Sequence, residues 1–198
     1  MKTTRLEAFS DGVLAIVLTI MVLELRAPHE TTLAGLWPLV PVFGSYVLSF
    51  VFVGIYWNNH HHLLYATERV DGRVLWANLH LLFWLSLIPF VTAWMGENGF
   101  ARVTVALYGV VLLLCSVAFA ILVRSIVAMP GANAALGAAL GSDWKSKTSL
   151  AAYALAVPAA LFVHPVAAGV LFVAVAGMWL VPDRRIERTV GAGADEVG

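Results

Sequence analysis

The sequence is short of charged residues. Only 12% of its 198 residues are Asp, Glu, Lys or Arg, whereas a soluble globular domain averages about 25%. Hydrophobic residues make up 61% of the chain, and the mean hydropathy is +0.86. This composition is typical of an integral membrane protein, and a formal net charge of zero gives no indication of a nucleic-acid partner.

Several motifs that carry chemistry are absent. The single cysteine, Cys115, has no partner for an intrachain disulfide. It also has no His or Asp close by in the sequence, and there is no His-Glu-x-x-His motif, so we expect no enzyme and no cofactor. The carbonyl-filter sequence Thr-Val-Gly-Tyr-Gly of potassium channels is missing as well.

Three consecutive histidines, His60, His61 and His62, are the obvious candidates for a metal site. Neighbouring residues on a helix point about 100° apart, so the three cannot converge on one ion from a single helix. We therefore favour hydrogen bonding at an interface and expect no metal site. A site that takes one histidine from each of several subunits is the alternative.

Hydropathy predicts an all-α fold, a bundle of six transmembrane helices at residues 5–26, 34–58, 74–95, 100–124, 147–163 and 165–182. Residues 1–182 form one unit with no evident internal repeat. Residues 183–198 are charged and rich in Gly and Ala, which indicates a disordered cytoplasmic tail.

Basic residues predict the orientation. A cytoplasmic N-terminus places ten of the twelve on the inside and leaves only Arg26 and Arg102 outside, which obeys the positive-inside rule. Six spans then put both termini in the cytoplasm, and we expect a multi-pass protein of the cell membrane.

The first span is polar at its start. Its apolar run, residues 12–23, has twelve residues, whereas a helix needs about 20 to cross the hydrocarbon core. Extending the helix back to Arg5 supplies the missing length and brings Ser10 and Asp11 to membrane depth. Polar groups there are costly and mark functional positions that face protein or water.

One stripe of this helix is nearly all apolar. At about 100° per residue, a four-three spacing places these residues along one side, with Ile20 beside them: Arg5, Phe9, Gly12, Ile16, Thr19 and Leu23. A lipid-facing stripe is the simplest interpretation, and packing on a sister helix is another. Because Asp11 lies about 140° from Ile16, the stripe can instead face a symmetry axis shared with further copies.

The pattern Arg-x-x-x-Phe-Ser-Asp, made by Arg5, Phe9, Ser10 and Asp11, closely resembles the first-helix signature of the endosomal and lysosomal potassium channels of the transmembrane protein 175 family. The likeness continues in two later segments. Residues 56–61, Tyr-Trp-Asn-Asn-His-His, resemble the end of the family's second helix, and residues 78–92 resemble its third helix.

The resemblance implies a potassium-permeable channel, selective for potassium over sodium, with a hydrophobic constriction in place of a carbonyl filter. Animal members carry two six-helix repeats, so a chain with one repeat implies a homotetramer in the lipid bilayer around a pore lined by the first helix. By motif position Ile16 forms the constriction. Thr19 or Ile20 lines the pore one turn further along, and Leu23 lines it two turns along. A narrow apolar ring closes by expelling water.

The resemblance also implies a structural polar network. Arg5, Phe9, Ser10 and Asp11 belong to the motif, and the matching partners are Trp57, His60 or His61, and Asn78. A helix cap at Ser10 or Asp11 is the alternative role. A proton- or cation-coupled transporter that uses Asp11 is the alternative function, although the paired repeats typical of transporters are not evident.

Overall fold

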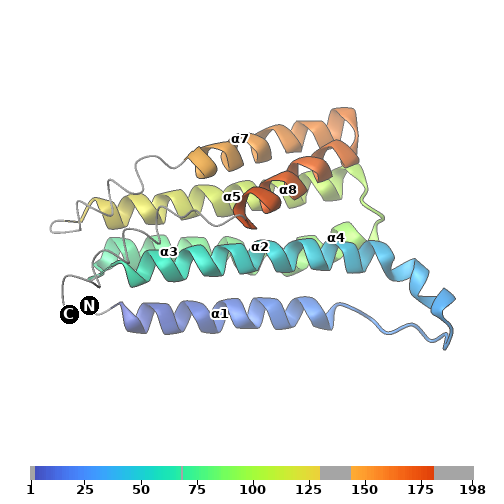
Figure 1. Ribbon diagram of the computed structural model, residues 1–198, viewed down its shortest axis with the longest axis horizontal. Helices are drawn as coiled ribbons and strands as arrows, with labels where there is room; N and C mark the ends of the chain where they lie inside the picture. The colour runs from blue at the N-terminus through green and yellow to red at the C-terminus, as the bar shows by residue number, and fades with distance from the viewer. Residues whose placement is uncertain (1–2, 68, 130–143, 181–198) are drawn as a thin grey trace.

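The computed structural model describes residues 3–67, 69–129 and 144–180, whose regular elements are all helices (Figure 1). The all-α class predicted from the sequence is confirmed. The predicted tail, residues 183–198, lies outside the described residues. The elements are α1 (Thr4–Leu23), η1 (Leu33–Leu39), α2 (Val40–Tyr65), α3 (Gly72–Ser86), α4 (Ile88–Glu97), α5 (Arg102–Val127), α7 (Trp144–Pro158), η2 (Ala159–Val163) and α8 (Pro165–Leu180).

Several elements join end to end into segments long and apolar enough to cross a membrane. By length and composition there are five such segments in the described part of the chain, Thr4–Leu23, Leu33–Tyr65, Gly72–Glu97, Arg102–Val127 and Trp144–Val163. The apolar helix α8 is shorter, with 16 residues. The molecule is therefore a multi-pass membrane protein.

Two helix ends differ from the prediction in ways that matter for the site. Helix α1 ends at Leu23, so Glu24 and Arg26 follow the helix instead of belonging to it. Helix α2 continues to Tyr65, seven residues past the predicted end at 58. No glycine or proline interrupts residues 58–65, so the polar residues there extend the helix, and the three histidines lie on its last two turns.

Proline explains the break in the third crossing. Helix α3 ends at Ser86 and α4 begins at Ile88, with Pro89 in the first turn of α4. Proline has no backbone N–H, so the bond that would continue the helix through this point is missing.

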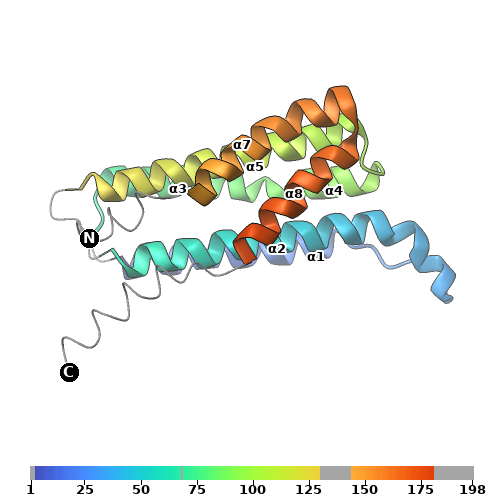
Figure 2. The same cartoon turned by 45° about the horizontal axis from the view of Figure 1, so that its top comes forward.

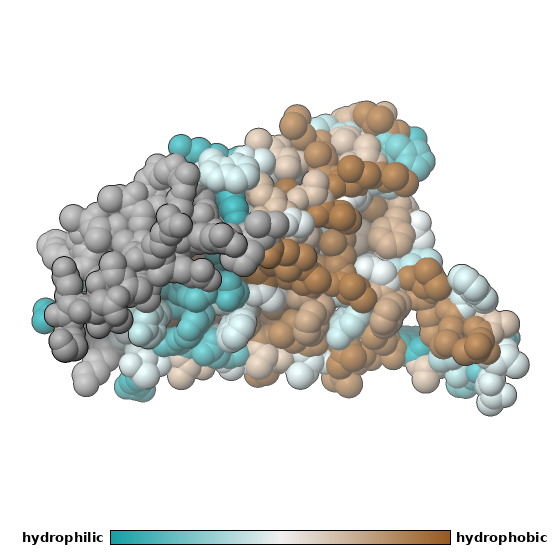
Figure 3. Space-filling model, viewed as in Figure 1, coloured by the Kyte–Doolittle hydropathy of each residue, from teal (hydrophilic) through white to brown (hydrophobic). Residues whose placement is uncertain are grey.

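Helix α1 lies along one edge of the bundle and packs on α2, α3 and α4 (Figure 1). Helices α5, α7 and α8 form the opposite side, and α8 crosses from α7 toward α2 (Figure 2). On the face shown in Figure 3, hydrophobic side chains cover much of the surface away from the end where α1 begins. Large exposed examples are Leu155, Phe162 and Val173. This surface suits a protein that is surrounded by lipid.

A buried hydroxyl chain joins α2, α4 and α5. The Ser49 Oγ lies 2.7 Å from Thr92 Oγ1 and 2.9 Å from the Tyr108 hydroxyl. Because the Thr92 hydroxyl donates to the Ile88 carbonyl, Ser49 donates to Thr92 and Tyr108 donates to Ser49. All three hydroxyls are thus satisfied away from water, as polar groups inside a membrane protein must be.

Helices α2 and α4 approach closely at Gly96. A Cβ atom on Gly96 would lie 2.5 Å from Ser45 Oγ and 2.8 Å from Val42 Cα. The second of these is a backbone atom and cannot swing aside. A glycine is therefore needed for this contact, in the manner of small residues at membrane helix interfaces.

We expect Gly96→Ala to destabilise the protein by about 1–3 kcal/mol, because the added methyl group pushes α4 away from α2. The measurement is the melting temperature of the purified protein in detergent. Gly177→Ala on α8 is the control, because a Cβ there meets nothing within 4 Å. Equal melting temperatures for the two variants would contradict the close contact.

Candidate functional site on the first helix

The apolar stripe of α1 is exposed on the isolated subunit. Phe9 is 52% exposed, Ile16 59%, Ile20 41% and Leu23 77%, and Gly12 and Thr19 are exposed beside them. The opposite side of α1 is packed into the bundle through Leu6, Leu14, Val17 and Met21. Every candidate pore residue predicted from the sequence therefore lies on the uncovered side of the helix.

Thr19 is the hydroxyl-bearing residue of that stripe. Its Oγ1 donates to the Ile16 carbonyl oxygen of the same helix at 2.9 Å. The proton is thus directed toward the helix backbone, and the oxygen lone pairs of an exposed side chain stay available as acceptors. An oxygen in this state can contact a cation.

Ser10 is the centre of a buried polar chain across three helices. Its Oγ donates to the Leu6 carbonyl at 2.8 Å and accepts from Asn78 Nδ2 at 3.0 Å. The Asn78 Oδ1 lies 2.7 Å from His60 Nε2. Because the Asn78 amide donates to Ser10, its oxygen accepts from His60, which fixes the neutral histidine with its proton on Nε2. Helices α1, α2 and α3 are thereby joined at one level.

The other His60 ring nitrogen is unusual. Nδ1 is the one buried side-chain nitrogen or oxygen without a hydrogen-bond partner in the described part of the chain. With the proton on Nε2, Nδ1 is a bare acceptor. The bond to Asn78 therefore holds the ring from one side only.

Two further contacts join α1 to α2. Trp57 Nε1 donates to Asp11 Oδ1 at 3.0 Å, and His61 Nδ1 lies 2.8 Å from Glu7 Oε1. Glu7 precedes Asp11 by four residues on α1, whereas His61 follows Trp57 by four residues on α2. The two contacts are therefore one helical turn apart along a pair of antiparallel helices. The His61 ring is stacked on the Trp57 ring, with their centroids 6.1 Å apart.

The predicted network residues divide into two groups. Ser10, Asp11, Trp57, His60, His61 and Asn78 all take part in these contacts. Arg5 and Phe9 are exposed, and Arg5 makes no hydrogen bond or ion pair with another described residue. Neither histidine bonds Asp11, whose partner is Trp57. Helix α1 begins at Thr4, so Ser10 and Asp11 lie inside it and do not cap it.

Glu7 is the network residue that the sequence interpretation missed. Its spacing gave a signal, because Glu7 precedes Asp11 by four residues and His61 follows Trp57 by four. Residues four apart share a helix face. A contact between Trp57 and Asp11 therefore brings His61 to Glu7 when the helices are antiparallel.

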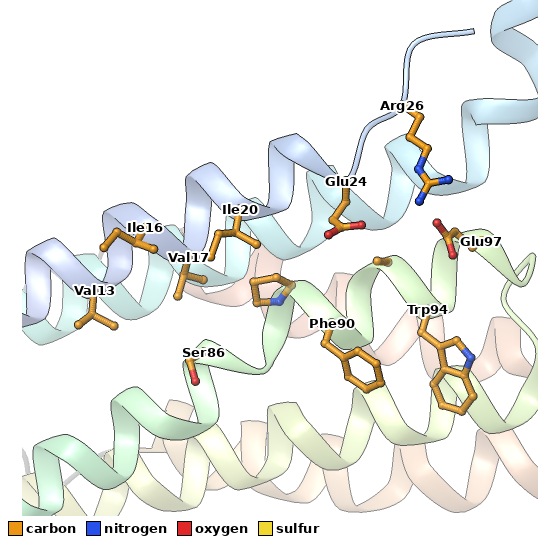
Figure 4. Close-up of a pocket in the computed structure, with 12 residues that line it drawn as sticks. Val13, Ile16, Val17, Ile20, Glu24, Arg26, Ser86, Phe90, Trp94 and Glu97 are labelled. Carbon is orange, nitrogen blue, oxygen red and sulfur yellow. The ribbon is translucent and has the colours of Figure 1, made fainter.

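A groove of about 660 Å³ lies beside the exposed stripe. Val13, Ile16, Val17 and Ile20 line it from α1, and Ser86, Phe90 and Trp94 line it from α3 and α4 (Figure 4). Glu24, Arg26 and Glu97 gather at one end of it (Figure 4). The groove is mostly apolar and borders two candidate pore residues, Ile16 and Ile20. No cluster of three or more metal-ligating side chains occurs among the residues that the structure describes.

Comparisons with known proteins place the chain in a family. The family model described as endosomal/lysosomal potassium channel TMEM175 matches residues 5–89, which include the stripe and the whole polar network. A protein of Chamaesiphon minutus, solved as a "lysosomal potassium-selective channel TMEM175 homolog", superimposes with a TM-score of 0.74 at 27% identity, covering 90% of this chain and 96% of that one.

Sequence relatives extend the match over nearly the full length. A protein of Chryseobacterium sp. named "Potassium channel HX13_20290" is 48% identical over 190 residues, which cover 96% of this chain and 98% of that protein. The human "Endosomal/lysosomal proton channel TMEM175" is 31% identical over 110 residues, half of this chain but only 21% of the human protein. The chain belongs to the endosomal/lysosomal potassium channel TMEM175 family.

Proposed function

We propose that this protein is a potassium-permeable channel in which four copies of the chain surround a central pore lined by α1. The observation that carries the proposal is the division of α1 into two sides. Ser10, Asp11 and Glu7 bond to α2 and α3, while Phe9, Ile16, Thr19 and Leu23 are exposed at membrane depth. The relatives named as potassium channels support the permeant ion.

A pathway between copies is favoured over one within a subunit. The interior of the bundle is filled by buried hydrophobic side chains, and the hydroxyl chain through Ser49 is closed by its own bonds. An ion that crosses the membrane needs a continuous hydrated path. Symmetric assembly around the exposed stripe creates such a path from residues that one chain leaves uncovered.

In this pore Ile16 forms the constriction. Four isoleucine side chains around the axis make a narrow apolar ring that closes by dewetting, because an ion cannot give up its hydration shell to hydrocarbon. Opening needs a modest widening of the ring. The Thr19 hydroxyl oxygens, one turn further along, are oriented to accept a contact from a cation, and Ile20 and Leu23 continue the lining.

Selectivity then follows from dehydration. Potassium holds its water less tightly than sodium, so it crosses an apolar ring at lower cost, with a weaker preference than a carbonyl filter provides. The polar network has a separate role, which is to hold the cytoplasmic half of α1 against α2 and α3 while the ring widens. The protein acts in the cell membrane with both termini in the cytoplasm and needs no cofactor.

We expect Ile16→Asn to raise sodium permeability relative to potassium, because an amide ring retains water and lets a partly hydrated ion pass. The measurement is ion flux from liposomes that contain purified protein, with potassium inside and sodium or protons as the opposing ion.

Ile16→Leu is the matched control, because it keeps the ring apolar and should close like the parent. Unchanged selectivity and flux in Ile16→Asn would remove Ile16 from the constriction. Potassium flux that depends strictly on a proton or sodium gradient would favour the coupled transporter, with Asp11 as its ion site.

We expect Asp11→Ala to lower channel assembly or open probability while single-channel conductance stays unchanged, because the carboxylate holds α1 and does not line the pore. Trp57→Phe should have a similar effect, since it removes the indole N–H that Asp11 accepts. Planar-bilayer recordings and size-exclusion profiles measure these quantities. Combining the two substitutions should add little, because both break the same bond. Wild-type currents from Asp11→Ala would contradict the network.

A further inference from the structure

Two polar surfaces lie near the start of α1, one shared by α1 and α2 and the other on α3. The acidic flank consists of Glu7 and Asp11 on α1 with Trp57 and His61 on α2, all of them at least partly exposed. The basic flank consists of Arg73, Trp76, His80 and Phe83 on α3, which recur at three- and four-residue spacing and are all exposed. Helix α1 lies next to both α2 and α3. Asn78 is the residue of α3 that faces Ser10 of α1, and at about 100° per residue Arg73 and His80 lie about 140° and about 160° from it, on the outer side of α3.

The polar groups of these flanks lie at matching depths. Asn78 bonds to Ser10, so these positions share a level, and α1 and α3 run in the same direction (Figure 1). His80 therefore lies at the level of position 12 and Arg73 at the level of position 5. At about 1.5 Å per residue, His80 is about 1.5 Å from the level of Asp11, and Arg73 is about 3 Å from the level of Glu7.

The groups have unused bonding capacity. Trp84 Nε1 donates to His80 Nε2 at 2.9 Å, so the proton of the neutral ring is on Nδ1. That N–H has no acceptor among the described residues. Asp11 and Glu7 each use one carboxylate oxygen within the subunit, and the second oxygen has no described partner. A donor at membrane depth is costly when it faces lipid, so His80 needs a protein acceptor.

We propose that the basic flank of one subunit docks on the acidic flank of the next, so that Arg73 donates to Glu7 and His80 donates to Asp11 across each interface. The inference rests on the proposed symmetric assembly. Rotation about an axis normal to the membrane preserves depth, and a ring of copies joins unlike surfaces head to tail. The opposite polarity of the two flanks at equal levels identifies a second copy as the occupant.

This interface extends the network around the pore. Asp11 accepts from Trp57 of its own subunit and from the neighbour's α3, so each α1 is held by two subunits. The polar contacts lie at the cytoplasmic half of the helix, below the apolar groove. A displacement of α3 in one subunit therefore shifts α1 of the neighbouring subunit.

Paired cysteines test the arrangement. In a Cys115→Ala background, Glu7→Cys combined with Arg73→Cys should give covalent dimers, trimers and tetramers on denaturing gels after treatment with copper phenanthroline or a short bismaleimide. Arg73→Cys combined with Phe83→Cys is the control, because both positions lie on the same flank and should give no ladder. Native mass spectrometry of the untreated protein reports the number of subunits independently.

The outcomes are distinct. A tetramer with the ladder supports the interface. A tetramer without the ladder overturns the interface and leaves the proposed channel assembly standing. A monomer in lipid-like detergent overturns the assembly, and the interface with it.

Charge exchange provides a second measurement that does not depend on cysteine geometry. Arg73→Glu and Glu7→Lys should each reduce the tetramer fraction, because each places like charges opposite one another. The two substitutions combined should restore it. Loss of tetramer in the double variant equal to the sum of the single losses would overturn the pairing.

Discussion

The need to satisfy polar groups at membrane depth governs the structure of this protein. Helix α1 is too short to cross the bilayer unless its polar first turns are included. In hydrocarbon, each unpaired hydrogen-bond donor or acceptor of those turns costs several kcal/mol. Every polar side chain that α1 turns toward its own bundle is bonded. Ser10 meets Asn78, Asp11 meets Trp57 and Glu7 meets His61.

These bonds also set the rotation of α1. Once Ser10 faces α3 and Asp11 faces α2, the four-three stripe through Ile16 and Thr19 is left facing out of the subunit. The C-terminal half of the helix is held differently, by apolar packing of Val17 and Met21. Helix α1 is thus attached by hydrogen bonds near its N-terminus and by apolar packing near its C-terminus.

The hydrogen-bonded network lies close along α1 to the proposed constriction. Asp11 lies five residues before Ile16, about 7.5 Å along the helix axis. In the proposed pore, a displacement of Asp11 therefore acts on the Ile16 ring through little more than one turn of the same helix. The groove beside Ile16 and Ile20 gives the apolar side chains room in the isolated subunit.

The membrane class, the all-α fold and the face of α1 that carries Ile16, Thr19, Ile20 and Leu23 can be predicted from the sequence, because hydropathy and helical periodicity are local properties. The sequence also identified six of the bonded residues through a motif. The hydrogen-bond pairs are visible only in the folded chain: Trp57 and neither histidine bonds Asp11, His60 bonds Asn78, and His61 bonds Glu7. Hydrogen-bond partners depend on the relative rotation and register of helices distant in the sequence, and packing of the whole bundle sets both.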